Sequence, residues 1–475
     1  MTVRIVRLLA LVFLATIASV AQTPHGYVPV ADPQVARKLE WFQDQKFGLM
    51  LHWGTYSQWG IVESWSLCPE DEGWCERKGP YANDYAAYVK AYEGLKTTFN
   101  PQRFDPDAWA LAAKSAGMRY VVFTTKHHDG FSMFDTKETD YKVTDAGCAF
   151  SGHPKANITK ELFDAFRDSG FGIGAYFSKP DWHSDDYWWR KFPPFDRNVN
   201  YDIAKYPERW ESFKQFTFDQ IRELMTEYGS IDILWLDGGW VQPMTATSPR
   251  WGKVPTNQDI DMPKIATMAR THQPGLIVVD RAVEGPYQNY ITPEHQVPDS
   301  ALGVPWETCM PMATSWSYVP DDVYRPTRTL VHLLVDIVAK GGNFLLNIGP
   351  SPEGTLADTA LLRLKEIGEW MDVNGGAIYG TRAIAPYKEG RMCFTRSQDG
   401  TINALYLADE GETTPPASIE VSAFTPKKGT HVTMMGVDAP LTWQRQGDGF
   451  VVRIPESVRR RPPSEWVWVI RLQPA

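Results

Sequence analysis

Short apolar runs alternate with longer amphipathic segments from about residue 31 to residue 379. The apolar runs predict strands at residues 47–53, 119–125, 171–178, 231–237, 276–281 and 343–348. The amphipathic segments predict helices, including those at residues 107–117, 159–170, 210–228, 261–272 and 326–340. Because the strand runs lack polar alternation, we expect both faces of the sheet to be covered, as in a parallel sheet packed between helices.

This alternation favours a (β/α)8-type TIM barrel, an α/β fold, over a doubly wound sheet. No glycine-rich phosphate-binding fingerprint follows the first strand, whereas polar residues follow the ends of several strands. Two of the eight strands of such a barrel are not visible in the pattern, so the full number is inferred from the fold type.

The helical pattern disappears after Tyr379. Segments 402–407, 417–421, 431–435, 450–454 and 466–472 alternate with turn residues, which predicts a C-terminal antiparallel β-sandwich. We therefore divide the chain into a signal peptide at residues 1–21, a barrel at residues 22–380 and the sandwich at residues 381–475.

The N-terminus has the pattern of a secretory signal. Arg4 and Arg7 precede the apolar run at residues 8–20, and small residues precede Gln22. The run is shorter than the roughly 20 residues of a membrane-spanning helix, and no later segment supplies one. We expect export to the periplasm or the cell exterior and no membrane span in the mature chain.

Composition limits the choice of ligand. The net charge of −9 argues against nucleic acid as a partner. The 19 Trp, 20 Tyr and 22 Phe suit a carbohydrate ligand, because aromatic rings stack on sugars, although core packing accounts for most of them. Among five cysteines, only Cys68 and Cys75 are near enough in sequence to suggest a local disulfide. The oligomeric state is not indicated.

Asp237 is the outstanding candidate for a nucleophile. It ends an apolar strand, lies between aromatic residues and precedes two glycines. The alternative is a helix N-cap, a common role for Asp after a strand. Cleavage of an acetal with retention needs a second carboxyl group about 5–5.5 Å away, and either Glu284 or Glu294 after the fifth strand could supply it.

Histidines follow two other predicted strands. His127 and His128 are adjacent, so both reach a ligand only if the chain turns there. With His52 and Asp129 they could hold a divalent ion, but no zinc-ligand spacing supports this. Binding of sugar hydroxyls by neutral histidines is the favoured interpretation.

Several blocks of the sequence resemble family 29 of the glycoside hydrolases, the retaining α-L-fucosidases. The blocks are KFGLMLHWG at residues 46–54, AGMRY at 116–120, TTKHHDGF at 124–131, LWLDG at 234–238 and NFLLNIGP at 343–350. The resemblance implies a catalytic barrel, a C-terminal β-sandwich, a fucosylated oligosaccharide substrate, and no cofactor or metal. It also implies that Asp237 is the nucleophile and favours Glu294 over Glu284 as the acid/base. The substrate-binding residues that it implies are His52, Trp65, His127, His128, Tyr176, Arg281 and Trp316.

Two other functions compete with this interpretation. An α-L-galactosidase would accept a sugar that carries a hydroxyl where L-fucose has a hydrogen on the sixth carbon, and the apolar Trp316 favours the methyl sugar. A catalytically silent fucose-binding protein would be suspected if either carboxylate were missing, and both are present.

Overall fold

The computed structural model describes residues 26–70, 75–245, 248, 250, 252–253, 256–427 and 429–473. Seven parallel strands form one sheet in the order β5-β4-β3-β2-β1-β7-β6. They are β1 (Phe47–Leu51), β2 (Tyr120–Lys126), β3 (Gly172–Ser178), β4 (Ile233–Asp237), β5 (Ile277–Asp280), β6 (Glu307–Pro311) and β7 (Asn343–Ile348). Strands β1 to β5 and β7 correspond to the predicted apolar runs.

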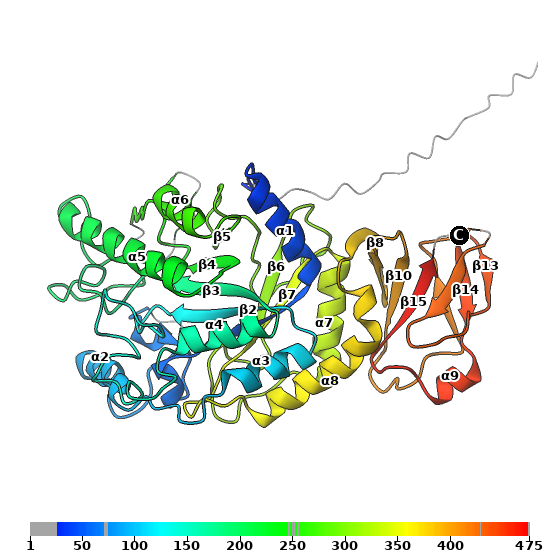
Figure 1. Cartoon of the computed structure of the whole chain (residues 1–475), viewed down its shortest axis with the longest axis horizontal. Coiled ribbons are helices and arrows are strands. Elements are labelled where there is room, and N and C mark those ends of the chain that lie inside the picture. The colour runs from blue at the N-terminus through cyan, green and yellow to red at the C-terminus, as the bar shows by residue number, and fades with distance from the viewer. Residues whose placement is uncertain are drawn as a thin grey trace, which may run out of the picture.

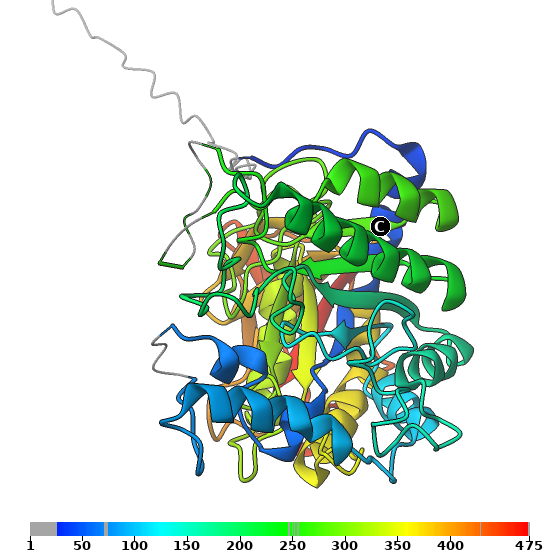
Figure 2. The ribbon, with the colours of Figure 1, turned by 90° about the vertical axis from the view of Figure 1, so that its left-hand side faces the viewer.

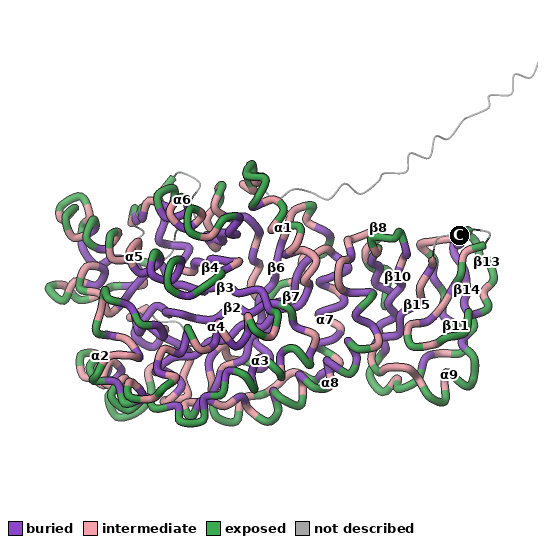
Figure 3. Tube along the Cα trace, in the orientation of Figure 1, coloured by how far each residue is buried: buried purple, intermediate pink, exposed green. Residues whose placement is uncertain are grey.

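Helices cover the outer face of this sheet, which lies at the centre of the larger part of the molecule (Figure 1, Figure 2). The strands are buried on both faces, as Figure 3 shows in purple. This confirms the predicted fold class. The helices are α1 (Pro33–Gln45), α2 (Tyr85–Glu93), α3 (Pro106–Ser115), α4 (Ile158–Asp168), α5 (Pro207–Glu227), α6 (Met262–His272), α7 (Thr327–Ala339) and α8 (Asp358–Asn374), with short helical turns η1 (Thr55–Gln58), η2 (Ser64–Leu67), η3 (Gly94–Thr97) and η4 (Gly375–Ala377).

The sheet has seven strands among the described residues, whereas the sequence interpretation inferred eight. The segment 288–294 lies between the two edge strands instead. Gln288 bridges Val279 of β5, and Glu294 bridges Cys309 of β6. This segment therefore connects the edges through isolated bridges. Proline at residue 293 has no N–H to donate, which disfavours a regular strand here.

A layer of large side chains fills the interior of the sheet below its carboxyl ends. It includes Tyr120, Trp235 and Tyr290, all nearly inaccessible to solvent. Helix α1 contributes Phe42 to this layer, and its ring stacks on Tyr290 with a centroid distance of 4.3 Å. The helix that precedes the first strand thus packs against the interior and supports it from the amino ends of the strands.

Two antiparallel sheets form the C-terminal part and enclose a separate apolar core. The first has the order β12-β15-β10-β9-β8 and the second β11-β14-β13. This confirms the predicted sandwich. Its elements are β8 (Arg382–Glu389), β9 (Met392–Arg396), β10 (Ile402–Leu407), β11 (Ser418–Val421), β12 (His431–Met434), β13 (Trp443–Gln446), β14 (Gly449–Arg453), α9 (Glu456–Arg460) and β15 (Val467–Gln473).

Three further sequence expectations concern a local disulfide, a signal peptide and membrane-spanning helices. The local disulfide is wrong, because Cys68 is a buried free thiol whose Sγ lies 3.4 Å from Glu70 Oε2. The signal peptide at residues 1–21 lies outside the described residues. Across the described part of the chain, no helix combines the length and apolarity needed to cross a membrane.

We predict that Phe42→Ala lowers the free energy of unfolding by about 3–5 kcal/mol, because it leaves a cavity between α1 and Tyr290. Denaturant titration measures this change. The control is Leu111→Ala on α3, where the side chain is 64% exposed and the expected change is within about 0.5 kcal/mol. Equal effects of the two substitutions would contradict the role given to α1.

Candidate active site

A cavity of about 860 Å³ opens at the carboxyl ends of the parallel strands. In barrel folds this end carries the active site. All the site residues predicted from the sequence line the cavity, namely His52, Trp65, His127, His128, Tyr176, Asp237, Arg281, Glu294 and Trp316. They come from strand ends and loops that are far apart in the sequence.

Asp237 is the last residue of β4, and a turn follows it rather than a helix. The helix N-cap alternative therefore does not apply. Gly238 has φ of +88°, and a Cβ there would lie 2.3 Å from Cδ of Pro180. Glycine is required by this conformation. Its N–H donates to Asp237 Oδ1 at 2.8 Å, which holds the carboxylate at the strand end.

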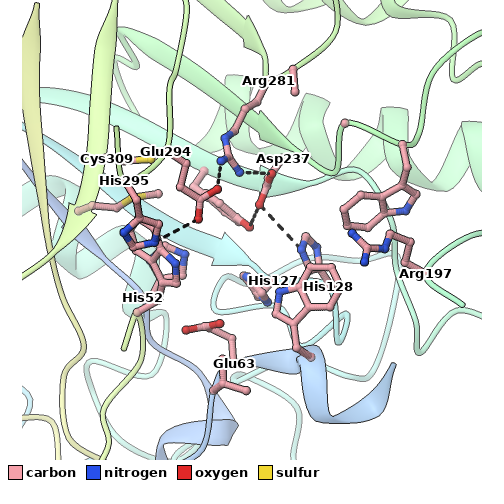
Figure 4. Close-up of a pocket in the computed structure, with 18 of the residues that line it drawn as sticks. His52, Glu63, His127, His128, Arg197, Asp237, Arg281, Glu294, His295 and Cys309 are labelled. Atoms are coloured by element: carbon pink, nitrogen blue, oxygen red, sulfur yellow. Dashed lines mark hydrogen bonds and ion pairs between the residues drawn. The ribbon is translucent and has the colours of Figure 1, made fainter. Parts of the chain in front are cut away.

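Arg281 joins Asp237 to Glu294. Its Nη1 donates to Asp237 Oδ1 at 2.9 Å, and its Nη2 donates to Glu294 Oε2. Figure 4 shows the guanidinium between the two carboxylates. Since one planar group contacts both, the carboxylates face the same small volume.

The second oxygen of Asp237 accepts a hydrogen bond from the Tyr176 hydroxyl at 2.8 Å and lies 3.8 Å from His128 Nε2. Burial alone raises the pKa of Asp237, but Arg281 and the donors Tyr176 and Gly238 outweigh it and hold that pKa well below its usual range. Asp237 is therefore an anion at neutral pH.

The structure separates the two candidate partners of Asp237. Glu294 lines the cavity, and its bridge to Cys309 holds it beside β6. Glu284 is an exposed residue that packs against Gly26 and does not line the cavity. Only Glu294 of these two faces Asp237.

A tight turn brings both adjacent histidines into the cavity. It follows β2, and Gly130 within it has φ of +79° and donates its N–H to the His127 carbonyl at 3.1 Å. The imidazole rings of His127 and His128 lie 4.2 Å apart between centroids. The requirement for a turn, inferred from their adjacency, is thus met.

A hydrogen bond sets the tautomer of His52. Its Nδ1 lies 2.7 Å from Asn347 Oδ1, while Asn347 Nδ2 donates to the Trp316 carbonyl. Nδ1 of His52 therefore carries the proton, and Nε2 is an acceptor. Ser64 Oγ accepts from the Asp129 N–H and holds the His127 ring through a 2.6 Å hydrogen bond with its Nδ1.

Burial keeps the histidines neutral. It lowers the pKa of His52 to about 4 and that of His128 to about 3, and it also lowers the pKa of His127. The site therefore offers neutral imidazoles to a neutral polar ligand at physiological pH, with His52 Nε2 as an acceptor.

Aromatic rings form the sides of the cavity. Trp65, on η2, stands at 86° to the His128 ring, and Trp316 lies 5.1 Å from the His52 ring. Arg281 lies over the ring of Trp235, which is part of the cavity floor. Such rings provide apolar faces beside the polar groups.

One set of side chains could also bind a metal ion. One ligand atom each from His127, His128 and Asp237 lies within 4.8 Å of the others. However, Arg281 already occupies Asp237 Oδ1, and its positive charge opposes a cation at this place. The set is better suited to hydroxyl groups.

Glu63 lines the cavity although it was not among the predicted site residues. Its side chain lies opposite Arg281 in Figure 4, and its Oε1 accepts a hydrogen bond from the Ser317 N–H at 2.9 Å. Burial raises its pKa to about 8. Its position two residues before Trp65 is the sequence signal that could have identified it.

Comparisons with known proteins show the family of this chain. The sequence model of the family described as "Alpha-L-fucosidase" matches residues 14–376, and that of the "Alpha-L-fucosidase C-terminal domain" matches residues 393–473. The chain is 27% identical to an alpha-L-fucosidase of Branchiostoma floridae over 491 residues, which cover 98% of this chain and 99% of that protein.

Two solved structures are similar over nearly the whole chain. Alpha-L-fucosidase isoenzyme 1 from Paenibacillus thiaminolyticus has a TM-score of 0.74 and 28% identity, covering 93% of this chain and 99% of that one. The Thermotoga maritima alpha-fucosidase in complex with a mechanism-based inhibitor has a TM-score of 0.70 and 25% identity, covering 94% and 100%.

A barrel with two facing carboxylates in a pocket at its carboxyl end is typical of glycoside hydrolases. This protein is a glycoside hydrolase. Because the family models match most of its length, the chain belongs to the α-L-fucosidase family, family 29 of the glycoside hydrolases.

We predict that Arg281→Met destabilises the protein more at pH 7 than at pH 4. In the wild type the pKa of Asp237 is below its unfolded value of about 3.9, so its stabilising effect is present above that pH. Without the guanidinium, burial raises the pKa of Asp237 above the unfolded value, and its contribution to stability is lost as pH rises. Breaking the pair should cost about 3–5 kcal/mol at pH 7 and at least about 1 kcal/mol less at pH 4.

Urea titrations at both pH values measure these free energies. The control is Arg460→Met, which breaks an exposed ion pair with Glu456 and should cost less than about 1 kcal/mol at either pH. A loss from Arg281→Met that is the same at pH 4 and pH 7 would contradict the electrostatic account of Asp237.

Proposed function

We propose that this protein is a retaining, exo-acting α-L-fucosidase that releases terminal α-linked L-fucose from oligosaccharides or glycoconjugates. The observation that carries the proposal is the contact of Asp237 and Glu294 with the two terminal nitrogens of one guanidinium. A shared guanidinium keeps the two carboxyl groups near each other, as the covalent mechanism of a retaining enzyme requires. The closeness supports a covalent intermediate.

In the first step Asp237 attacks the anomeric carbon, and the bond from that carbon to the leaving oxygen breaks. Glu294 gives its proton to the leaving oxygen, so the aglycone departs as a neutral alcohol. The product of this step is a fucosyl ester of Asp237. Tyr176 and Gly238, which donate to the carboxylate oxygens, orient it for attack.

In the second step Glu294, now a carboxylate, takes a proton from water. The oxygen of that water attacks the anomeric carbon, the ester bond breaks and Asp237 is released as an anion. Two inversions give net retention. Arg281 stays in contact with both carboxylates through the cycle and stabilises whichever of them is charged.

We assign the remaining predicted residues to recognition of the sugar. The acceptor Nε2 of His52 and the imidazole of His127 suit different hydroxyl groups, and His128 and Tyr176 place polar atoms beside Asp237. Trp65 and Trp316 supply apolar faces. An apolar face at the sixth carbon favours the methyl of L-fucose over the hydroxymethyl of L-galactose.

We also propose that the protein is exported from the cytoplasm. The arginines and apolar run of residues 1–21 are typical of a secretory signal. A fucosidase in the periplasm or outside the cell would meet fucosylated glycans there. Detection of the protein in the periplasmic or culture fraction, with cleavage near residue 21, would test this part.

We predict that Asp237→Gly lowers turnover of 4-nitrophenyl α-L-fucoside by a factor of at least about 10⁴, because the nucleophile is lost. Added azide should restore activity by filling the vacated space and yield a fucosyl azide. Release of nitrophenol and mass analysis of the product measure both effects. Normal turnover by a correctly folded variant would defeat the assignment.

We predict that Glu294→Ala lowers kcat by roughly 10²- to 10⁴-fold on fucosylated oligosaccharides, and much less on an aryl fucoside whose leaving group needs no proton. Rates over a series of leaving groups measure the difference. Glu284→Ala is the matched control, since this exposed glutamate does not line the cavity, and its kcat should stay within about twofold of wild type. If Glu284→Ala shows the leaving-group effect instead, Glu294 is not the acid/base.

A further inference from the structure

Glu307 is a buried carboxyl group that the proposed reaction does not use. It is the first residue of β6, and its side chain has no exposed surface. It does not line the cavity that holds Asp237 and Glu294. Burial raises its pKa to about 7. A carboxyl group in such a place destabilises the fold unless its oxygens are fully used.

Three donors from three different segments meet at Glu307. The Tyr120 hydroxyl of β2 donates to Oε2 at 2.6 Å. Oε1 accepts from Trp235 Nε1 of β4 and from the Tyr290 hydroxyl, each at 3.2 Å. All three donor side chains are almost completely buried. Glu307 therefore connects strands on opposite sides of the interior with the segment between the sheet edges.

Two of these segments carry the proposed catalytic carboxylates. Trp235 precedes Asp237 by two residues on β4, and its ring lies beneath Arg281 with a distance of 5.3 Å from the guanidinium carbon. Tyr290 precedes Glu294 by four residues in the segment that bridges the sheet edges. The third donor, Tyr120, lies at the start of β2, six residues before Lys126 ends that strand.

The segment of Tyr290 is attached to both sheet edges outside a regular ladder. Isolated bridges pair Ile291 with Trp306 and Glu294 with Cys309, and the Asn289 N–H donates to the Val278 carbonyl at 3.0 Å. The bond from Tyr290 to Glu307 and the stacking of its ring on Phe42 anchor it from inside.

We propose that Glu307 is a positioning residue that sets the separation of Asp237 and Glu294 by holding Trp235 and Tyr290 on one carboxylate oxygen. This rests on the proposed retaining mechanism, in which that separation decides how well the proton and the nucleophile reach the same glycosidic bond. Glu307 acts through its neighbours and does not touch the sugar.

The test compares Tyr290→Phe with Tyr120→Phe. Each substitution removes one hydroxyl that bonds to the same carboxylate, keeps the ring and lies at a fully buried position. Similar losses of thermal stability are therefore expected. Only Tyr290 shares a segment with Glu294, so only its loss should displace the acid/base.

We expect Tyr290→Phe to lower kcat about tenfold to a hundredfold on fucosides with poor leaving groups, with a smaller effect on aryl fucosides and a KM within about twofold. Tyr120→Phe should keep kcat on every substrate within about twofold of wild type. An unchanged kcat in Tyr290→Phe, or equal losses in the two variants, would overturn the positioning role.

Glu307→Gln is a conservative variant that removes the charge and can keep the hydrogen bonds. Its amide oxygen can still accept from Trp235 and Tyr290, and its amide nitrogen can donate to the Tyr120 hydroxyl. The leaving-group dependence should stay close to that of wild type. A folded Glu307→Gln with a larger kcat loss than Tyr290→Phe would show that charge rather than position matters, and would overturn the proposal. If the wild type itself releases no fucose, the proposed function fails independently of these variants.

Discussion

The guanidinium of Arg281 contacts the carboxyl groups of both Asp237 and Glu294 at one cavity, and the rest of the site depends on this contact. Two neighbouring carboxyl groups repel each other whenever both are ionised, unless a cation lies between them. The guanidinium itself packs on the ring of Trp235, which lies beneath it. The surrounding histidines remain neutral because burial lowers their pKa values, so they add no charge to disturb this balance.

The fold supplies the geometry through parallel strands that end at one edge. Asp237 ends β4, Arg281 follows β5 directly, and the turn after β2 presents two histidines. Below this layer, aromatic side chains fill the interior and α1 closes the opposite end with Phe42. Residues that touch no ligand therefore determine where the polar groups lie, and Glu307 illustrates this for the two carboxylates.

Much of this arrangement could be predicted from the sequence, because apolar runs followed by polar residues are a strong local signal. Strand β10 was predicted at its observed residues, and every predicted site residue lies on one cavity. Strand β6 was missed because its buried polar residues Glu307 and Thr308 interrupt the apolar pattern. The residue pattern left Glu284 and Glu294 open and the family resemblance favoured Glu294; both follow β5, and only packing places one of them at the cavity. The roles of these residues in catalysis stay predictions.

The irregular segment 288–294 has an implication for how this active site can change during evolution. A residue within a hydrogen-bonded ladder cannot be moved along the chain without reversing which side of the sheet it faces. The isolated bridges of this segment impose no such alternation, so the position of Glu294 along it is not tied to a strand register. The proposed proton donor can thus change its sequence position, whereas the proposed nucleophile Asp237 is fixed by the regular pairing of β4 with β3.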